Sequence, residues 1–160
     1  MKLKPTVYVE TSALSVLVAR RSRNAEEAAR QLLTRAWWKR RSEMALFTSR
    51  VVRDEARIGD PKEARKRLAI ARTLTDLLVT PEAEDLAIEL IKRCAMPPKA
   101  TTDAFHLAVA AVHHMEFLVS WNCRHLVNTH ILNQAFRIFE RAGYNVPQVC
   151  TPDVFVGGGL

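Results

Sequence analysis

Three carboxylates in this sequence stand where they could bind a divalent cation. Glu10 ends a run from Thr6 to Val9 whose β-branched and aromatic residues predict a short buried strand. Glu55 lies on the apolar side of a predicted helix, and Asp103 lies in the first turn of a helix that is apolar nearly all round. Carboxylates that come close together repel one another, and a bound Mg²⁺ or Mn²⁺ relieves that repulsion. Such a site performs metal-assisted phosphodiester hydrolysis.

Each of the three acids also has a structural explanation, which the sequence leaves open. Glu10 is equally consistent with a surface residue at the end of a strand. Glu55 is explained by an ion pair with a structural Arg or Lys, and Asp103 by the helix dipole, which favours an acid in the first turn by about 0.3–1 kcal/mol. The next helical turn carries His106, for which a hydrogen-bonded core histidine is favoured over a metal ligand. The segments that carry the three acids are expected to offer no basic residue that would neutralise them.

The elements that must position these acids alternate between strands and helices. This order predicts an α/β fold, a single three-layer α/β/α domain with a central parallel sheet over residues 1–156, followed by a flexible tail at 157–160. In such a sheet, ligands bind at the carboxyl ends of the strands, where Glu10 lies. Strands are predicted at 6–9, 45–48, 77–79, 117–120 and 146–150. Helices are predicted after Thr11 or Ser12 and after Ser49, and at 25–41, 61–73, 81–94, 103–112 and 130–142.

Helix starts are predicted from capping residues. Thr11 or Ser12 is expected to cap the first helix, Ser49 the helix that carries Glu55, and Thr101 or Thr102 the helix that carries Asp103. Two further helices follow the pairs Asp60-Pro61 and Thr80-Pro81, in which a capping side chain precedes proline at the first helical position.

The helix at 25–41 combines an apolar stripe with many basic residues. Its predicted buried stripe consists of Ala25, Ala29, Leu32, Leu33 and Ala36. Trp38 falls opposite that stripe, so an exposed tryptophan among arginines is expected there, typical of a contact surface. The competing interpretation packs Trp38 into the core.

Composition narrows the class of partner. Lys and Arg number 24 against 17 Asp and Glu, which gives a net charge of +7 and favours an anionic partner such as nucleic acid. No apolar run reaches the roughly 18 residues of a membrane helix. The three cysteines have neither C-x-x-C spacing nor a nearby histidine partner at zinc-finger spacing, so reduced thiols in a cytoplasmic protein are expected.

Four ordered segments resemble the PIN-domain family, and in particular the VapC-type toxins of toxin–antitoxin pairs. A late Cys150-Thr151-Pro152 is also similar to the exit of that family's C-terminal strand. The four segments run from Val7 to Ser12, from Arg53 to Pro61, from Thr102 to Ala108 and from Leu118 to Leu126.

The resemblance implies an endoribonuclease that requires Mg²⁺, with Mn²⁺ as a substitute. Glu10, Glu55 and Asp103 match the family's acidic positions, so Glu10 and Asp103 would ligate the metal and Glu55 would bind it directly or through water. The first position is more often Asp, and the position of Asn122 is often a fourth acid. Asn122 and the Ser12 hydroxyl are candidate contacts for water or phosphate. RNA is the implied substrate, an antitoxin protein the implied partner, and a homodimer the implied assembly.

Two other functions remain open. One is a PIN-like module that binds RNA or protein without cleaving, for which Asn122 in place of an acid is the main argument. The other is a phosphohydrolase that acts on small phosphate esters, although the sequence has no glycine-rich loop to cradle a phosphate.

Overall fold

The computed structural model describes residues 3–122, 126 and 129–157. Its centre is a five-stranded sheet in the order β3-β2-β1-β4-β5, and every neighbouring pair of strands is parallel. The predicted α/β architecture with a central parallel sheet is therefore confirmed. The strands are β1 (Thr6–Val9), β2 (Ala45–Ser49), β3 (Thr75–Leu77), β4 (Phe117–Val119) and β5 (Gln148–Cys150).

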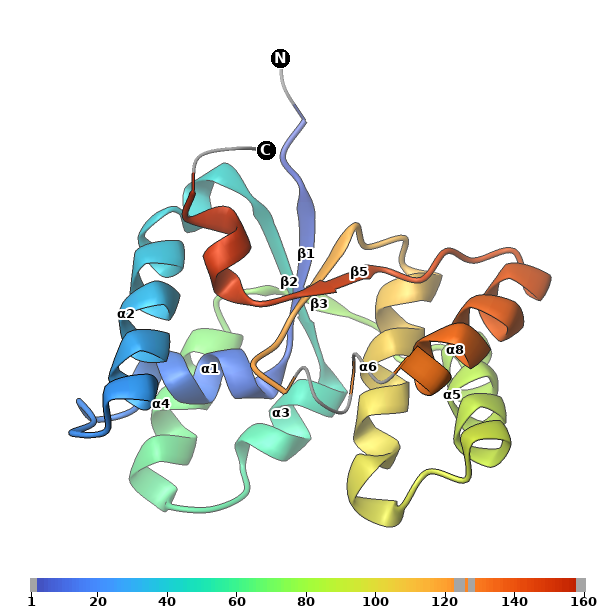
Figure 1. The fold of residues 1–160 in the computed structure, drawn as a ribbon, viewed down its shortest axis with the longest axis horizontal. Coiled ribbons are helices and arrows are strands. Elements are labelled where there is room, and N and C mark those ends of the chain that lie inside the picture. The colour runs from blue at the N-terminus through green and yellow to red at the C-terminus, as the bar shows by residue number, and fades with distance from the viewer. Residues whose placement is uncertain (1–2, 123–125, 127–128, 158–160) are drawn as a thin grey trace.

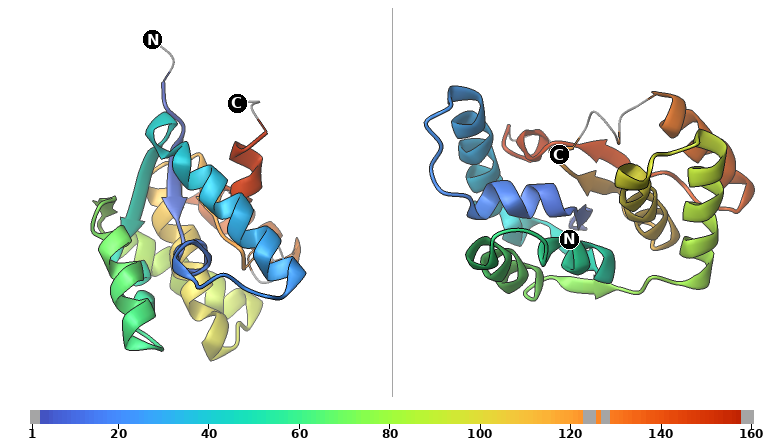
Figure 2. Two further views of the ribbon diagram at one scale, coloured as in Figure 1. Left: turned by 90° about the vertical axis from the view of Figure 1, so that its left-hand side faces the viewer. Right: turned by 90° about the horizontal axis from the view of Figure 1, so that it is seen from below.

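Helices cover the two faces of this sheet. Figure 1 shows α1 to α4 on one side of the strands and α5, α6 and α8 on the other. The left-hand view of Figure 2 looks from the side of α1 to α4, and there β1 and β2 run side by side. The helices are α1 (Thr11–Val18), α2 (Ala25–Lys39), α3 (Arg50–Ala56), α4 (Pro61–Ala71), α5 (Pro81–Cys94), α6 (Thr101–Val112) and α8 (Thr129–Arg141), with short 3-10 turns at Arg41–Glu43, Pro98–Ala100 and Pro152–Phe155.

The core lies between these layers and is formed by the central strands and α6. Val7, Tyr8 and Val9 of β1 have no exposed surface, and neither do Leu118 and Val119 of β4. Strands that are buried on both faces need apolar residues in succession, which is why β1 reads as a continuous apolar run. Helix α6 is buried along most of its length, as its all-round apolar sequence predicts.

Two edge strands differ from their predicted bounds. The third strand, predicted at 77–79, lies at Thr75–Leu77, because Leu77 pairs with Ser49, the last residue of β2. The last strand, predicted at 146–150, begins at Gln148, which pairs with Phe117, the first residue of β4. In both cases the length of the neighbouring strand sets the limit, and a local pattern does not contain that information.

The predicted buried face of α2 is wrong. Gln31, Thr34 and Trp37 form the buried face, whereas Ala25, Ala29 and Leu32 are exposed. Trp38 is half-buried and packs against the core, with its ring centroid 5.8 Å from that of Trp37. The helix is turned about its axis relative to the prediction, because two tertiary hydrogen bonds hold Gln31 and Thr34 inward. The Gln31 amide donates to the Arg20 carbonyl, and the Trp121 ring N–H donates to the Thr34 hydroxyl.

The predicted caps are confirmed for two helices. Asp60 and Thr80 cap α4 and α5 with their side chains. Two other assignments are wrong, because Glu10 caps α1 and α6 begins after Ala100. Ser49 takes the predicted N-cap position of α3, but its side chain makes no capping hydrogen bond. Ser49 instead bonds the buried Tyr8 hydroxyl, which a local sequence pattern could not indicate.

Some predictions fall on residues that the structure does not describe. Residues 123–125 of the fourth matching segment and residues 158–160 of the predicted tail lie outside the described ranges. The domain bounds 1–156 remain a prediction. Within residues 3–122, 126 and 129–157, the structure has no helix with the length and apolarity that a membrane span requires.

Candidate active site

The candidate site lies between the carboxyl ends of β1 and β4. The chain leaves β1 toward β2 on one side and reaches β4 on the other side only later, so this is the switch point of the sheet. Ligands of open α/β sheets bind at such points, where the loops after two strands diverge. Glu10 follows β1, and its backbone N–H donates to the Val119 carbonyl at 3.1 Å, which joins the ends of the two strands.

Glu10 is buried, with 3% of its surface exposed. Its Oε2 accepts hydrogen bonds from the Ser12 backbone N–H at 3.0 Å and from the Ser120 hydroxyl at 2.8 Å. The Ser12 hydroxyl donates to the same oxygen. Three donors on one oxygen hold the carboxylate in a fixed direction and stabilise its charge. The Ser12 hydroxyl was predicted to contact water or phosphate, and in the structure its hydrogen is donated to Glu10.

Glu55 approaches Glu10 from α3. Its Oε1 accepts a hydrogen bond from the Thr11 hydroxyl at 2.7 Å and lies 2.6 Å from Nε2 of His106. The neighbouring Asp54 faces solvent, where it pairs with Arg57 at 2.7 Å. Glu55 therefore points inward, as expected for the apolar side of this helix, although Ile58, which the sequence pattern places on the same side, is 72% exposed.

His106 lies inside the acidic cluster with no exposed surface. Its Nδ1 is 2.9 Å from the Tyr8 hydroxyl, which in turn lies 2.7 Å from the Ser49 hydroxyl. Both ring nitrogens are thus bonded, as favoured for a hydrogen-bonded core histidine. The expectation that no basic group neutralises the acids is wrong, because His106 lies next to Glu55 and 3.9 Å from Glu10.

The charges of this cluster stabilise one another. Burial lowers the pKa of His106, but the hydrogen bond to Glu55 and the charges of Glu10, Glu55 and Asp103 outweigh burial and raise it above its ordinary value. Burial raises the pKa of Glu55, and the hydrogen bonds and charge from His106 and Thr11 outweigh burial and lower it. The Glu55 carboxylate therefore favours the protonated form of the His106 ring, and the ring in turn favours the ionised form of Glu55.

Asp103 and Asn122 complete the predicted set from two further elements. Asp103 lies one turn before His106 on α6 and is 6% exposed. Asn122 follows β4, and its Nδ2 is 3.5 Å from Oδ1 of Asp103, a long contact. Its backbone N–H donates to the Ser120 hydroxyl at 2.8 Å. Residues from α3, α6 and the ends of β1 and β4 thus converge on one location.

The donor set fits a divalent cation. One ligand atom each from Glu10, Glu55 and His106 can be chosen so that all lie within 4.8 Å of one another. Carboxylate oxygens are the preferred ligands of Mg²⁺ and Mn²⁺. This group differs from the predicted triad because it contains His106, whose ring nitrogen bonds Glu55. Asp103 lies on the same helix as His106, and its charge helps to raise the pKa of His106.

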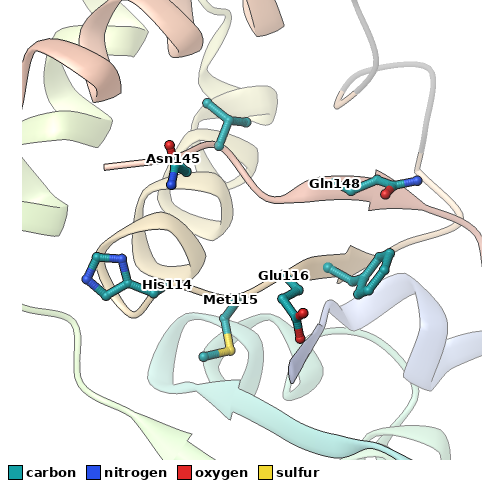
Figure 3. Close-up of a pocket in the computed structure, with 7 residues that line it drawn as sticks. His114, Met115, Glu116, Asn145 and Gln148 are labelled. Atoms are coloured by element: carbon teal, nitrogen blue, oxygen red, sulfur yellow. The ribbon is translucent and has the colours of Figure 1, made fainter. Parts of the chain in front are cut away.

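A cavity of about 330 Å³ lies away from these acids, at the opposite end of β4 (Figure 3). His114, Glu116 and Gln148 are among its lining residues, and the Glu116 carboxylate accepts a hydrogen bond from the Thr6 backbone N–H at 2.7 Å. The cavity is therefore at the amino ends of the strands, where open parallel sheets do not place their ligands. Its one carboxylate already serves to join β1 to β4.

A comparison with known protein families matches the part of the chain that forms the candidate site. The family model described as PIN domain matches residues 7–123, which span β1 to the loop after β4 and include every residue of the candidate site. The chain belongs to the PIN-domain family. Among solved structures, this PIN domain is similar to Mycobacterium tuberculosis VapC20, described as a toxin that cleaves the Sarcin-Ricin loop.

The similarity to VapC20 concerns the fold. The TM-score is 0.58 at 20% identity, over 88% of this chain and 97% of the VapC20 chain. No curated protein matches the sequence. The match to the PIN-domain family model confirms the resemblance that the four segments carry.

The sequence does not reveal the supporting residues of this PIN domain. Tyr8 bonds His106, Thr11 and Ser120 bond the acids, and Ser49 bonds Tyr8, yet each reads as an ordinary strand or cap residue. A weak indication exists for Ser120, which follows the apolar run of a predicted strand directly, as Glu10 does.

Proposed function

We propose that this PIN-domain protein is a Mg²⁺-dependent endoribonuclease, with Mn²⁺ as a substitute, and the toxin of a toxin–antitoxin pair. The observation that carries the proposal is the approach of the buried Glu10 and the half-buried Glu55 to one another at the switch point of the sheet, with the buried Asp103 one turn before His106. The fold relative described as a cleaving toxin, VapC20, supports the RNA substrate. The net charge of +7 supports a polyanionic substrate.

The residues of the site would each have a distinct task. Glu10, Asp103 and Glu55 would hold the cation, and the donors on Glu10 fix the direction of its carboxylate. A bound Mg²⁺ supplies charge stabilisation for the scissile phosphate and lowers the pKa of an attacking water. Glu55, whose lowered pKa keeps it ionised, orients that water as a hydrogen-bond acceptor. Asn122 offers an amide to water or phosphate without adding charge.

The test is cleavage of a labelled single-stranded RNA with Mg²⁺, with Mn²⁺ and with EDTA. Wild type is expected to cleave with either metal and to be inactive with EDTA. Glu10→Gln should be inactive with both metals. Asp54→Asn is the matched control, since Asp54 is adjacent to Glu55 in sequence but faces solvent, and it should retain activity. A wild type that stays inactive with both metals, or an active Glu10→Gln, would refute the proposal.

A second candidate function is RNA or protein binding without cleavage, and Asn122 favours it. With Asn in place of an acid, the site has one negative charge fewer to hold a metal. This candidate expects RNA binding by wild type but no cleavage with Mn²⁺, even when Asn122→Asp restores the charge.

The proposal also includes a protein partner, an oligomeric state and a location in the cell. We expect an antitoxin protein as partner, a homodimer and a cytoplasmic location. Co-expression with the product of an adjacent small reading frame, followed by size-exclusion chromatography, checks the first two. Isolation of a monomer that no such product binds would argue against them.

A further inference from the structure

Arg30 and Trp121 form a stacked pair beside the candidate active site. The Arg30 guanidinium carbon lies 5.5 Å from the centroid of the Trp121 ring, a cation–π contact between α2 and the residue that follows Ser120. Arg30 also pairs with Glu26, one turn earlier, at 2.6 Å. Neither side chain of this ion pair is deeply buried, since 42% of Arg30 and 75% of Glu26 are exposed.

Trp121 is fixed to the site through its backbone and its ring. Its backbone N–H donates to the Ser12 hydroxyl at 2.8 Å, and Ser12 in turn bonds Glu10. Its ring N–H donates to the Thr34 hydroxyl of α2, also at 2.8 Å. The ring is therefore held between the acidic site and α2, and it holds the Arg30 guanidinium at the margin of that site.

An RNA strand needs a cation at this location. The carboxylates of Glu10, Glu55 and Asp103 repel a phosphodiester backbone that approaches without a metal, so affinity must come from the residues around them. A guanidinium that stacks on an aromatic face keeps its planar edge of N–H donors free for phosphate oxygens. The ion pair with Glu26 is an exposed pair of small net stability, which a phosphate can replace.

We propose that Arg30, held on the face of Trp121, binds a backbone phosphodiester of the RNA strand adjacent to the one at the acidic site. This subsite rests on the proposed function for its substrate class. It assigns Arg30 a direct contact with the substrate and Trp121 the task of positioning Arg30. The Glu26 carboxylate holds the guanidinium in the free protein and is displaced when RNA binds.

The sequence supplies a matched control pair on α5. Arg93 and Glu89 form the same i,i+4 ion pair at 2.9 Å, with exposures of 47% and 45%. The probe is a fluorescein-labelled single-stranded RNA of mixed sequence, and the readout is fluorescence anisotropy in EDTA over a salt series. Arg30→Gln is expected to weaken binding about tenfold, as for the loss of a charge-assisted hydrogen bond, whereas Arg93→Gln stays within about twofold. The salt slope should fall by about 0.7 in Arg30→Gln alone, the value for one phosphate contact on a single strand.

Two further variants separate substrate contact from a structural role. Glu26→Gln releases the guanidinium and should tighten RNA binding more than Glu89→Gln, although both remove one negative charge from a helix. Trp121→Phe retains an aromatic face for Arg30 and should bind RNA more tightly than Trp121→Leu. A purely structural Arg30 would predict equal salt slopes for Arg30→Gln and wild type.

The outcomes for the subsite and for the nuclease are distinguishable. If wild type binds and cleaves RNA but Arg30→Gln matches Arg93→Gln in affinity and salt slope, the subsite is refuted and the nuclease stands. If wild type binds RNA without cleaving and Arg30→Gln binds about tenfold more weakly, the subsite stands and the nuclease is refuted. A wild type that cleaves RNA with metal but does not bind it in EDTA refutes the subsite alone, and one that neither binds nor cleaves refutes both.

Discussion

Nε2 of the fully buried His106 lies 2.6 Å from Oε1 of Glu55, so the acidic site contains its own counter-charge. A histidine in this position neutralises part of the carboxylate repulsion when no metal is bound. It also links the site to the core through the Tyr8 and Ser49 hydroxyls. The stability of the metal-free protein should therefore depend on this pair.

The first prediction is a maximum in stability at mildly acidic pH. The raised pKa of His106 stabilises the fold fully below its unfolded value of 6.5, and this contribution is lost as pH rises through the folded pKa. The lowered pKa of Glu55 stabilises the fold above its unfolded value of 4.5, and this contribution is lost as pH falls through the folded pKa. Urea unfolding in EDTA should give the highest free energy between these two values. His106→Gln should lack the decline on the alkaline side, and an unchanged decline would contradict the prediction.

The second prediction separates two acids that a catalytic assay cannot distinguish. Glu55→Gln and Asp103→Asn should both abolish Mg²⁺-dependent RNA cleavage. Glu55→Gln should also lower the free energy of unfolding by about 1–3 kcal/mol, because it removes the carboxylate that bonds the buried His106 ring. Asp103→Asn removes a charge from the cluster but leaves that ion pair intact, so it should stay within about 1 kcal/mol of wild type. Denaturant unfolding of both variants in EDTA checks this, and an equal loss in both would argue against it.

Asn122 gives the third prediction. A carboxylate at this position would lie close to Asp103, whose Oδ1 is 3.5 Å from the present amide nitrogen. Asn122→Asp should therefore bind Mn²⁺ at least about tenfold more tightly in calorimetry, since charge attraction in a partly buried site amounts to several kcal/mol. Asn145→Asp, at the cavity on the opposite end of the sheet, is the control and should leave affinity unchanged. Unchanged affinity in Asn122→Asp would place residue 122 outside the metal site.

The fourth prediction concerns the fold alone. The Thr48 hydroxyl is buried without a hydrogen-bond partner in the described structure, and Thr48 has no exposed surface. Thr48→Val should raise the free energy of unfolding by about 1–2 kcal/mol, because it removes an unsatisfied polar group and keeps the β-branched shape. Thr34→Val is the opposite case. Its hydroxyl accepts from Trp121 and donates to the Arg30 carbonyl, so its loss should cost about 1–3 kcal/mol. Urea unfolding of both variants checks the two signs, and a destabilised Thr48→Val would contradict the prediction.

The two tryptophans of α2 give the fifth prediction. Trp37 is fully buried, and Trp38 is half-buried with Arg41 stacked 5.3 Å from its ring centroid. Trp37→Ala should cost about 3–5 kcal/mol in unfolding free energy. Trp38→Ala should cost clearly less, because part of its ring already faces solvent. Chemical denaturation of both variants compares them, and an equal cost would make Trp38 a core residue with no role at a surface.

Features that depend on neighbouring residues can be predicted from the chain itself. The buried run of β1 and the carboxylate after it are adjacent in sequence, so their pattern alone places Glu10 at a strand end. The caps at Asp60 and Thr80 are equally local, since each side chain bonds a backbone N–H two or three residues on. The alternation of strands and helices then predicts the parallel sheet, because parallel strands require crossover connections.

Other features of the site depend on partners that are far apart in sequence. Ser49 bonds Tyr8 where a cap was expected, and α2 turns Thr34 inward because Trp121, 87 residues later, donates to it. His106 is the counter-charge of the site only because α3 brings Glu55 to it, across 51 residues. A single sequence records the residue types, but hydrogen bonds and ion pairs of this range depend on which elements pack together. The residue types along the chain therefore indicate the acids and the sheet that gathers them, whereas packing sets which side chains orient and neutralise them.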